Sequence, residues 1–394
     1  MPRKQRAFFA IMLLLVGAAA EGVAAVTTRV LVRRGWMAEI PALGPAEQAR
    51  YFAWRNPLLG WGPRVDTTDR RPPPTRADPG PGGGAAPCAS TYGDSFTWGL
   101  DVPPDGAYPH QLGMLLGCGV VNYGVPGYGS DQALLLFRAQ ARGDRAPVVV
   151  LAHVSENVLR NVNQYRNLLY PGQQRGFKPR FVVDGDSLRL VPIPIHGPED
   201  LRDLPAHPAR HLAYEAFLGR PRRGFPYTWS LLRWVVSDYH VRARLGGYPR
   251  HRPFYQPGHP AGGLAVTTRI LAAFSREARA RGRAPFVLLV PTGPDFAYAR
   301  QTGEWADQPL ADALAREGVA VIHVGPEMLR RLGGREPCTL FTDCSGHFNV
   351  AGYRMLAEVA AEGMRAAGAA GRHASPGQGG RGEGRNRQGD QRTE

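Results

Sequence analysis

Two short runs of the chain are wholly apolar, and they constrain its fold more than any other feature. They are residues 147–152 (PVVVLA) and 285–291 (PFVLLVP). A strand without a polar face must be buried on both sides, which is typical of a parallel sheet covered by helices. The two runs therefore predict two central strands of such a sheet.

Other segments extend this pattern along the chain. Three further strand-like runs lie at 88–92, 118–123 and 319–324, and helical stretches lie at 107–116, 130–142, 265–281, 307–316 and 349–367. Strands that alternate with helices predict an α/β fold. We expect a three-layer α/β/α domain with a doubly wound, parallel, five-stranded sheet of the flavodoxin-like kind.

The composition divides the chain into a folded domain and flanking segments. We predict an anchor at 1–34, a juxtamembrane segment and Pro/Gly-rich linker at 35–86, the domain at 87–371 and a disordered tail at 372–394. An insertion of about 162–262 separates the third and fourth strands, and it contains a predicted hairpin at 180–183 and 187–191.

The N-terminus has the pattern of a signal anchor. Arg3, Lys4 and Arg6 precede an apolar run at 7–26 that only Glu21 interrupts. About 20 apolar residues form roughly 30 Å of helix, enough to cross a bilayer. We favour an uncleaved transmembrane helix with its basic end in the cytoplasm and the domain outside, periplasmic or at the cell surface. A cleaved signal peptide remains the alternative, because alanines are frequent near the end of the run.

The charge of the chain does not indicate nucleic-acid binding. Lys+Arg is 48 and Asp+Glu is 33, which gives a net charge of +15. The excess is spread over the chain, and no nucleic-acid-binding motif accompanies it, so we expect a solvated arginine-rich surface. An apolar content of 43% excludes a wholly disordered chain, and enrichment in Arg, Ala, Gly and Pro suggests a bacterial source.

Four cysteines fit an oxidising compartment. Three pairings are possible for Cys88, Cys118, Cys338 and Cys344. We favour Cys88–Cys118, because each stands at the start of a strand-like run, and Cys338–Cys344, because the two are close in sequence. Four free buried thiols are the alternative.

Residues suited to acyl transfer follow the predicted strands, whose carboxyl ends share one edge of the sheet. They are Gly93-Asp94-Ser95, Asn122 to Gly127, Ser155-Glu156-Asn157, and a final loop that contains Asp343, His347 and Asn349. A serine, a histidine, an acid and several potential amide donors are the groups that a serine nucleophile requires.

These blocks resemble those of the SGNH (GDSL-type) serine hydrolases over roughly residues 87–370, without the insertion. The resemblance implies Ser95 as the nucleophile, His347 as the general base and Asp343 as the acid that orients it. It also implies an oxyanion hole formed by the amides of Ser95 and Gly127 and the side chain of Asn157.

Two departures from the family pattern leave alternatives open. The third block is usually Gly-x-Asn-Asp, and an ungapped match puts Glu156 where the asparagine belongs. A carboxylate cannot donate to an oxyanion, so we predict a shift by one residue to Asn157; otherwise Asn157 caps a helix. The family acid usually precedes the histidine by three residues, whereas Asp343 precedes His347 by four. A Ser-His dyad is the alternative.

The sequence therefore predicts a membrane-anchored serine esterase that hydrolyses or transfers an acyl group of an extracytoplasmic glycan or lipid ester. We expect no cofactor, no metal ion and no nucleic-acid partner. The alternatives are a polysaccharide O-acetyltransferase of the same fold and a non-catalytic SGNH-like binding module. The sequence gives no basis for predicting an oligomeric state.

Overall fold

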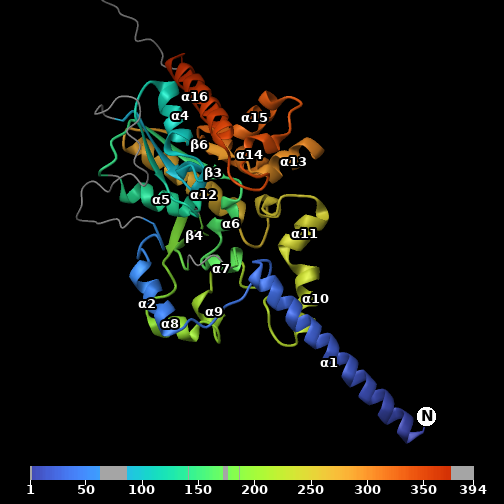
Figure 1. The fold of residues 1–394 in the computed structure, drawn as a ribbon. Coiled ribbons are helices and arrows are strands. Elements are labelled where there is room, and N and C mark those ends of the chain that lie inside the picture. Colours follow the sequence, from blue (N-terminus) through green and yellow to red (C-terminus); the bar gives the residue numbers. More distant parts are fainter. Residues whose placement is uncertain (1, 63–86, 141, 172–175, 186, 374–394) are drawn as a thin grey trace, which may run out of the picture.

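A parallel five-stranded sheet forms the centre of the molecule (Figure 1). The computed structural model describes residues 2–62, 87–140, 142–171, 176–185 and 187–373. The strands follow the order β2-β1-β3-β6-β7, with bounds β1 Ala89–Gly93, β2 Val120–Gly124, β3 Val148–Val154, β6 Ala284–Val290 and β7 Val321–His323. The predicted α/β class and the number and direction of the strands are confirmed.

Helices cover both faces of the sheet, as the apolar strands require. One face carries α5 (Ser130–Ala139), α12 (Gly263–Ala280) and α14 (Gln308–Arg316), and the other α4 (Tyr108–Leu116), α15 (Val324–Leu332) and α16 (Val350–His373). Leu151 of β3 belongs to the first core and Val150 to the second, and both are fully buried. Alternate residues of one strand thus supply two cores, which makes the three predicted layers.

Within the sheet domain, two helices of nine or ten residues lie where we predicted none. The first is α13 (Gly293–Thr302), which follows β6, and the second is α15. Both have a Gly-Pro pair near their start, and such a pair in a sequence usually indicates a loop, which is why no helix was predicted there. Proline is nevertheless well tolerated in the first turn of a helix, because the amide that it lacks has no intrahelical partner there.

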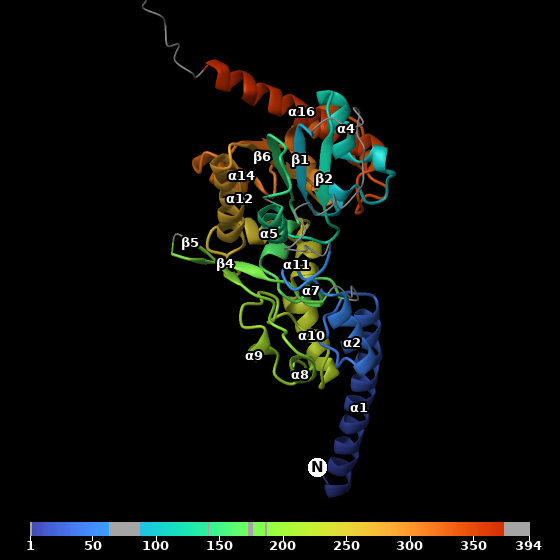
Figure 2. The ribbon, with the colours of Figure 1, turned by 90° about the vertical axis from the view of Figure 1, so that its left-hand side faces the viewer.

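The insertion forms a second lobe at the carboxyl edge of the sheet (Figure 2). It includes the predicted hairpin, confirmed as β4 (Arg180–Asp184) and β5 (Ser187–Val191). Its helical elements are α7 (Arg166–Leu169), α8 (Pro198–Asp203), α9 (Pro208–His211), α10 (Tyr227–Ser237), α11 (Tyr239–Gly246) and η2 (Arg252–Tyr255), and α6 (Asn157–Asn161) lies directly before it. Buried residues such as Phe217 and Phe254 belong to the same core as α12, so the lobe is packed onto the sheet domain.

The remaining elements are α1 (Arg3–Arg33), α2 (Pro45–Trp54), α3 (Ser95–Trp98), η1 (Pro104–Gly106) and η3 (Pro337–Leu340). Both favoured disulfides, Cys88–Cys118 and Cys338–Cys344, are formed. Residues 63–86 of the predicted segment 35–86, and residues 374–394 of the predicted tail, lie outside the described residues.

Candidate active site

Ser95 is held at the carboxyl end of β1 by the residue before it. Asp94 caps the short helix α3, because its Oδ1 accepts a hydrogen bond from the Phe96 amide at 2.9 Å. Gly93 ends the strand, and a side chain there would collide with Thr97. The sharp strand-to-helix turn therefore requires a glycine and a capping aspartate before the serine.

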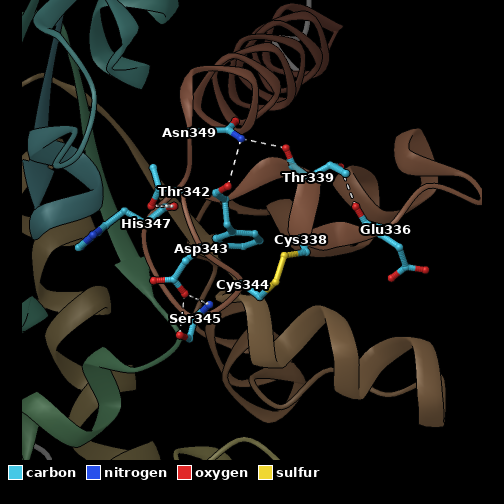
Figure 3. The surroundings of a disulfide bond; sticks show 10 residues. Glu336, Cys338, Thr339, Thr342, Asp343, Cys344, Ser345, His347 and Asn349 are labelled. Carbon is cyan, nitrogen blue, oxygen red and sulfur yellow. Dashed lines mark hydrogen bonds between the residues drawn. A yellow bond between two sulfur atoms is a disulfide. The ribbon is translucent and has the colours of Figure 1, made fainter.

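His347 reaches Ser95 from the opposite end of the chain. Its Nε2 lies 2.8 Å from Ser95 Oγ. The backbone carbonyl of His347 accepts a hydrogen bond from the Thr342 amide at 2.9 Å, which closes the loop before α16. Figure 3 shows the Cys338–Cys344 disulfide in this loop, with the His347 ring pointing away from it. The structure thus brings together the predicted nucleophile and the predicted base.

The acid beside His347 is Asp101, not Asp343, so the expectation for Asp343 was wrong. Asp101 Oδ2 lies 2.9 Å from His347 Nδ1. Asp343 instead accepts hydrogen bonds at 2.8 Å from the amide and the hydroxyl of Ser345, which also lower the pKa of its carboxyl group (Figure 3). The turn that includes Gly346 directs Asp343 back onto its own loop.

Asp101 has a backbone conformation that side chains rarely adopt. Its φ is +69°, which makes it the one non-glycine residue with positive φ in the described part of the chain. This region costs most residues about 1–2 kcal/mol, and aspartate tolerates it better than most. Strained residues that the surrounding structure maintains are often functional. The sequence signal for Asp101 was weak: an aspartate directly after the turn that ends the nucleophile helix at Gly99.

The third predicted segment also differs from our expectation. Glu156, not Asn157, lines the cavity that contains Ser95 and His347. Asn157 begins α6, is 1% exposed, and its Oδ1 has no hydrogen-bond partner within the described structure. The predicted shift by one residue was therefore wrong, because the turn of α6 directs Asn157 into the protein. The remaining predicted oxyanion donors, the amides of Ser95 and Gly127, belong to residues that line the cavity.

Glu156 enters the cavity as one member of an ion pair. Its Oε1 accepts hydrogen bonds from Arg250 Nε at 3.2 Å and Nη2 at 2.9 Å, and its Oε2 accepts one from the Tyr170 hydroxyl at 3.1 Å. Burial disfavours the ionised form, but Arg250 and Arg160 outweigh it and lower the pKa of Glu156 to about 2. Glu156 is therefore an anion at neutral pH, with Arg250 beside it as a cation.

Two buried arginines fix the backbone around the nucleophile and the predicted oxyanion hole. Arg160 Nη1 donates to Asp94 Oδ2 at 2.8 Å and to the Tyr128 carbonyl at 2.9 Å. Arg166 Nη1 donates to the Gly127 carbonyl at 2.9 Å. Gly127 has a φ of +85°, which suits a glycine in the left-handed region. These contacts hold the segments of Ser95 and Gly127 in a fixed relation.

The cavity lies between the sheet domain and the insertion and measures about 510 Å³. Ser95, Gly127 and His347 come from the sheet domain, whereas Arg166 and Arg250 come from the insertion. The guanidinium groups of Arg160, Arg166 and Arg250 lie 5.7, 4.4 and 5.0 Å from the centre of the Tyr170 ring. Three arginines thus surround one tyrosine beside the cavity, and two of them are paired with carboxylates, Arg160 with Asp94 and Arg250 with Glu156.

Two tyrosines close to the site have packing roles. Tyr123 is 5% exposed and stacks on Tyr92, and Tyr128 is fully buried and donates its hydroxyl hydrogen to the Trp61 carbonyl. Phe96 and Tyr170 are the aromatic residues along the described cavity wall.

A second buried polar network supports the floor of the site. Asp295 accepts hydrogen bonds from the amide and hydroxyl of Thr292, a cavity residue, and pairs with His251 at 2.7 Å. Burial opposes charge on both groups, yet their mutual attraction lowers the pKa of Asp295 and raises that of His251. This ion pair fixes the loop after β6. Within the described ranges, no group of His, Cys, Asp and Glu has the arrangement of a metal site.

Comparisons with known proteins give structural matches alone. No protein-family model and no curated protein matches the chain. Three solved structures that match are TesA, a lipolytic protein of the G-D-S-L family from Desulfitobacterium hafniense, and a catalytic mutant of Axe2, an acetylxylan esterase from Geobacillus stearothermophilus. They are 14%, 11% and 14% identical, with TM-scores of 0.38, 0.36 and 0.35.

The matches cover 71%, 70% and 71% of this chain and 98%, 98% and 95% of the respective solved chains. These structures come from the superfamily of GDSL and SGNH hydrolases that the sequence motifs resemble. The likeness carries no conclusion about activity, so the functional argument rests on the geometry of the site.

The site has the arrangement for acyl transfer. Ser95 Oγ can lose its proton to His347 Nε2 as it attacks a carbonyl carbon. Asp101 holds Nδ1–H and stabilises the imidazolium that forms.

The acid assignment predicts a difference between two aspartates. Asp101→Asn should lower kcat for acetyl-ester hydrolysis by roughly 100-fold or more, because the imidazole loses its orienting acceptor. Asp343→Asn, the matched control on the final loop, should change kcat by about twofold at most, since Asp343 contacts Ser345 and not the imidazole. Steady-state kinetics on both variants measure this, and the reverse order of effects would restore Asp343 as the acid.

The Glu156–Arg250 pair predicts a compensating double substitution. Arg250→Gln leaves the charge of Glu156 less neutralised beside the developing oxyanion. At an effective dielectric constant near 20, such a charge costs about 1–3 kcal/mol, which lowers kcat roughly 10- to 100-fold. Adding Glu156→Gln should recover most of the loss, whereas Glu156→Gln alone should have a small effect.

The control for this cycle is Arg189→Gln, which removes a half-exposed arginine that is paired with Asp184 and does not line the cavity. It should leave kcat and KM unchanged. If the double variant is as slow as Arg250→Gln, the arginine acts by another route than neutralising Glu156.

Proposed function

We propose that the protein is a serine esterase that forms an acyl-enzyme on Ser95. The observation that supports this most directly is the continuous chain of hydrogen bonds from Ser95 Oγ through His347 to Asp101, at 2.8 and 2.9 Å. If Ser95 were only a turn residue, it would not need a histidine as a hydrogen-bond partner. If His347 were only structural, it would not need an aspartate with a strained backbone at its other ring nitrogen. The same chain argues against the non-catalytic alternative.

The reaction would proceed in two steps. Ser95 Oγ attacks the ester carbonyl while His347 takes its proton, and the amides of Ser95 and Gly127 stabilise the oxyanion. His347 then protonates the leaving alcohol. In the second step His347 deprotonates water, or the hydroxyl of an acceptor, which attacks the acyl-enzyme and frees Ser95. Hydrolysis and transfer to a glycan differ in this second step alone.

We further propose that the domain lies outside the cytoplasm, anchored by α1. This helix spans Arg3–Arg33, has a mean hydropathy of 2.2 in its most apolar window and is 6% buried there. A helix of this length can cross a bilayer, with Arg3, Lys4 and Arg6 at the cytoplasmic end. Two disulfides in the domain support an oxidising compartment. A glycan or lipid ester of the cell envelope is the substrate that we propose for an enzyme so placed.

Two substitutions test the enzymatic proposal. Ser95→Ala and His347→Ala should each abolish hydrolysis of p-nitrophenyl acetate by the full-length protein in detergent. The double variant should lose little more than either single one, because the members of a triad act as a unit. Thermal unfolding should stay close to that of the wild type, which separates lost chemistry from lost folding.

Full activity in Ser95→Ala would overturn the proposal. Repeating the wild-type assay with and without a soluble oligosaccharide separates hydrolysis from transfer. An acetylated sugar product identifies a transferase, and acetate alone identifies a hydrolase.

A further inference from the structure

The helix α10 of the insertion packs alongside α1 (Figures 1 and 2). The carboxylate of Glu21, within the apolar run of α1, accepts hydrogen bonds from the Tyr227 amide and, at 3.1 and 2.7 Å, from the amide and hydroxyl of Thr228. Near the other end, Trp234 Nε1 donates to the Trp36 carbonyl at 3.1 Å. The two helices therefore run in the same direction, in contact over most of α10.

The face of α10 that α1 leaves uncovered is apolar. Trp229 is 58% exposed and Val236 is 66% exposed, and Leu232 and Val235 are exposed with them. Phe225, just before the helix, is 79% exposed. Arg233 is the one charged residue in the helix itself. A water-facing helix normally presents polar side chains on its outer face, so this surface is suited to another environment.

An apolar groove continues this surface onto α1. It measures about 710 Å³, and nearly all of its lining residues are aliphatic: Val16, Ala19, Ala20, Val23, Ala24, Leu231, Leu232 and Val235, with Thr228. The same groove thus belongs to the proposed membrane-spanning helix and to α10. The medium that surrounds α1 between Val16 and Ala24, whether water or lipid, therefore also contacts α10.

The position of Glu21 sets the depth of α10. The apolar run ends near Val26, five residues after Glu21. At 1.5 Å per residue, the start of α10 lies about 8 Å inside the outer end of the run. Because α10 runs alongside α1, its start lies inside the apolar run, whereas its other end, where Trp234 contacts Trp36, lies beyond the end of that run. Arg29, Arg33 and Arg34 follow the run, where anionic headgroups attract cationic side chains.

We propose that α10, with Phe225, is a second membrane contact that inserts its apolar face into the outer leaflet beside α1. This inference rests on the membrane anchorage proposed above. The lipid bilayer is the occupant because the exposed face is continuous with the proposed span and begins within its depth, and because basic residues of α1 follow the apolar run. The insertion also lines the active-site cavity. A second membrane contact would therefore hold that cavity in a fixed orientation to the membrane, which attachment through α1 alone would not do.

Site-directed fluorescence on the full-length protein in vesicles of phosphatidylcholine and phosphatidylglycerol tests this. All four cysteines form disulfides, so an introduced cysteine provides a single free thiol for an environment-sensitive nitrobenzoxadiazole label. The reporters are Trp229→Cys and Leu232→Cys on α10, both exposed on its apolar face. Leu14→Cys within the proposed span and the exposed Met114→Cys on α4 are the controls.

Both α10 labels and the Leu14 label should lose most of their fluorescence to lipids with brominated acyl chains and be protected from aqueous iodide. The Met114 label should show the reverse. If the Leu14 label behaves as expected but both α10 labels are quenched by iodide, the inference is wrong and the anchor remains. Protection of the α10 labels from both quenchers would show a protein partner or second copy there, which also overturns it. A Leu14 label open to iodide would refute the anchorage itself.

Discussion

The buried ion pair between Asp94 and Arg160 holds together the parts of the molecule that form the site. Asp94 is fully buried, and each of its carboxylate oxygens has a defined partner: one caps the helix of Ser95 and the other accepts from Arg160. Arg160 also binds the Tyr128 carbonyl beside Gly127. A buried pair is favourable only when its remaining hydrogen-bonding groups are satisfied, and breaking it leaves an uncompensated charge. Three strand ends are therefore linked through one guanidinium group.

The insertion supplies charged and aromatic side chains to the active-site cavity. Arg166, Tyr170 and Arg250 turn the open edge of the sheet into a walled cavity, and Arg250 neutralises the carboxylate that stands where an amide donor was expected. A lone carboxylate facing the oxyanion would oppose the reaction, since like charges repel strongly where water is excluded. The sheet thus supplies the reacting groups, and the insertion sets the electrostatic conditions around them.

Sequence reasoning was accurate where local pattern determines structure. The apolar runs predicted the five strands, and the order of residues after them predicted that Ser95 and His347 would meet although 252 positions separate them. It failed where one side-chain direction decides the outcome. Glu156 and Asn157 are adjacent, and the turn into α6 determines which faces the cavity. Asp343 is close to His347 in sequence, but its side chain accepts a hydrogen bond from Ser345. Asp101 reaches His347 because its backbone is left-handed, and the hydrophobic periodicity of the sequence does not indicate such a conformation.

The central claim is that His347 activates Ser95 as a nucleophile, and covalent labelling by a fluorophosphonate tests it most directly. Peptide mass spectrometry of the labelled wild-type protein should find the phosphonyl group on Ser95. The labelling rate should fall by several orders of magnitude in His347→Ala. The account would be contradicted if the folded wild-type protein stayed unlabelled, if a different serine carried the group, or if labelling of Ser95 did not depend on His347.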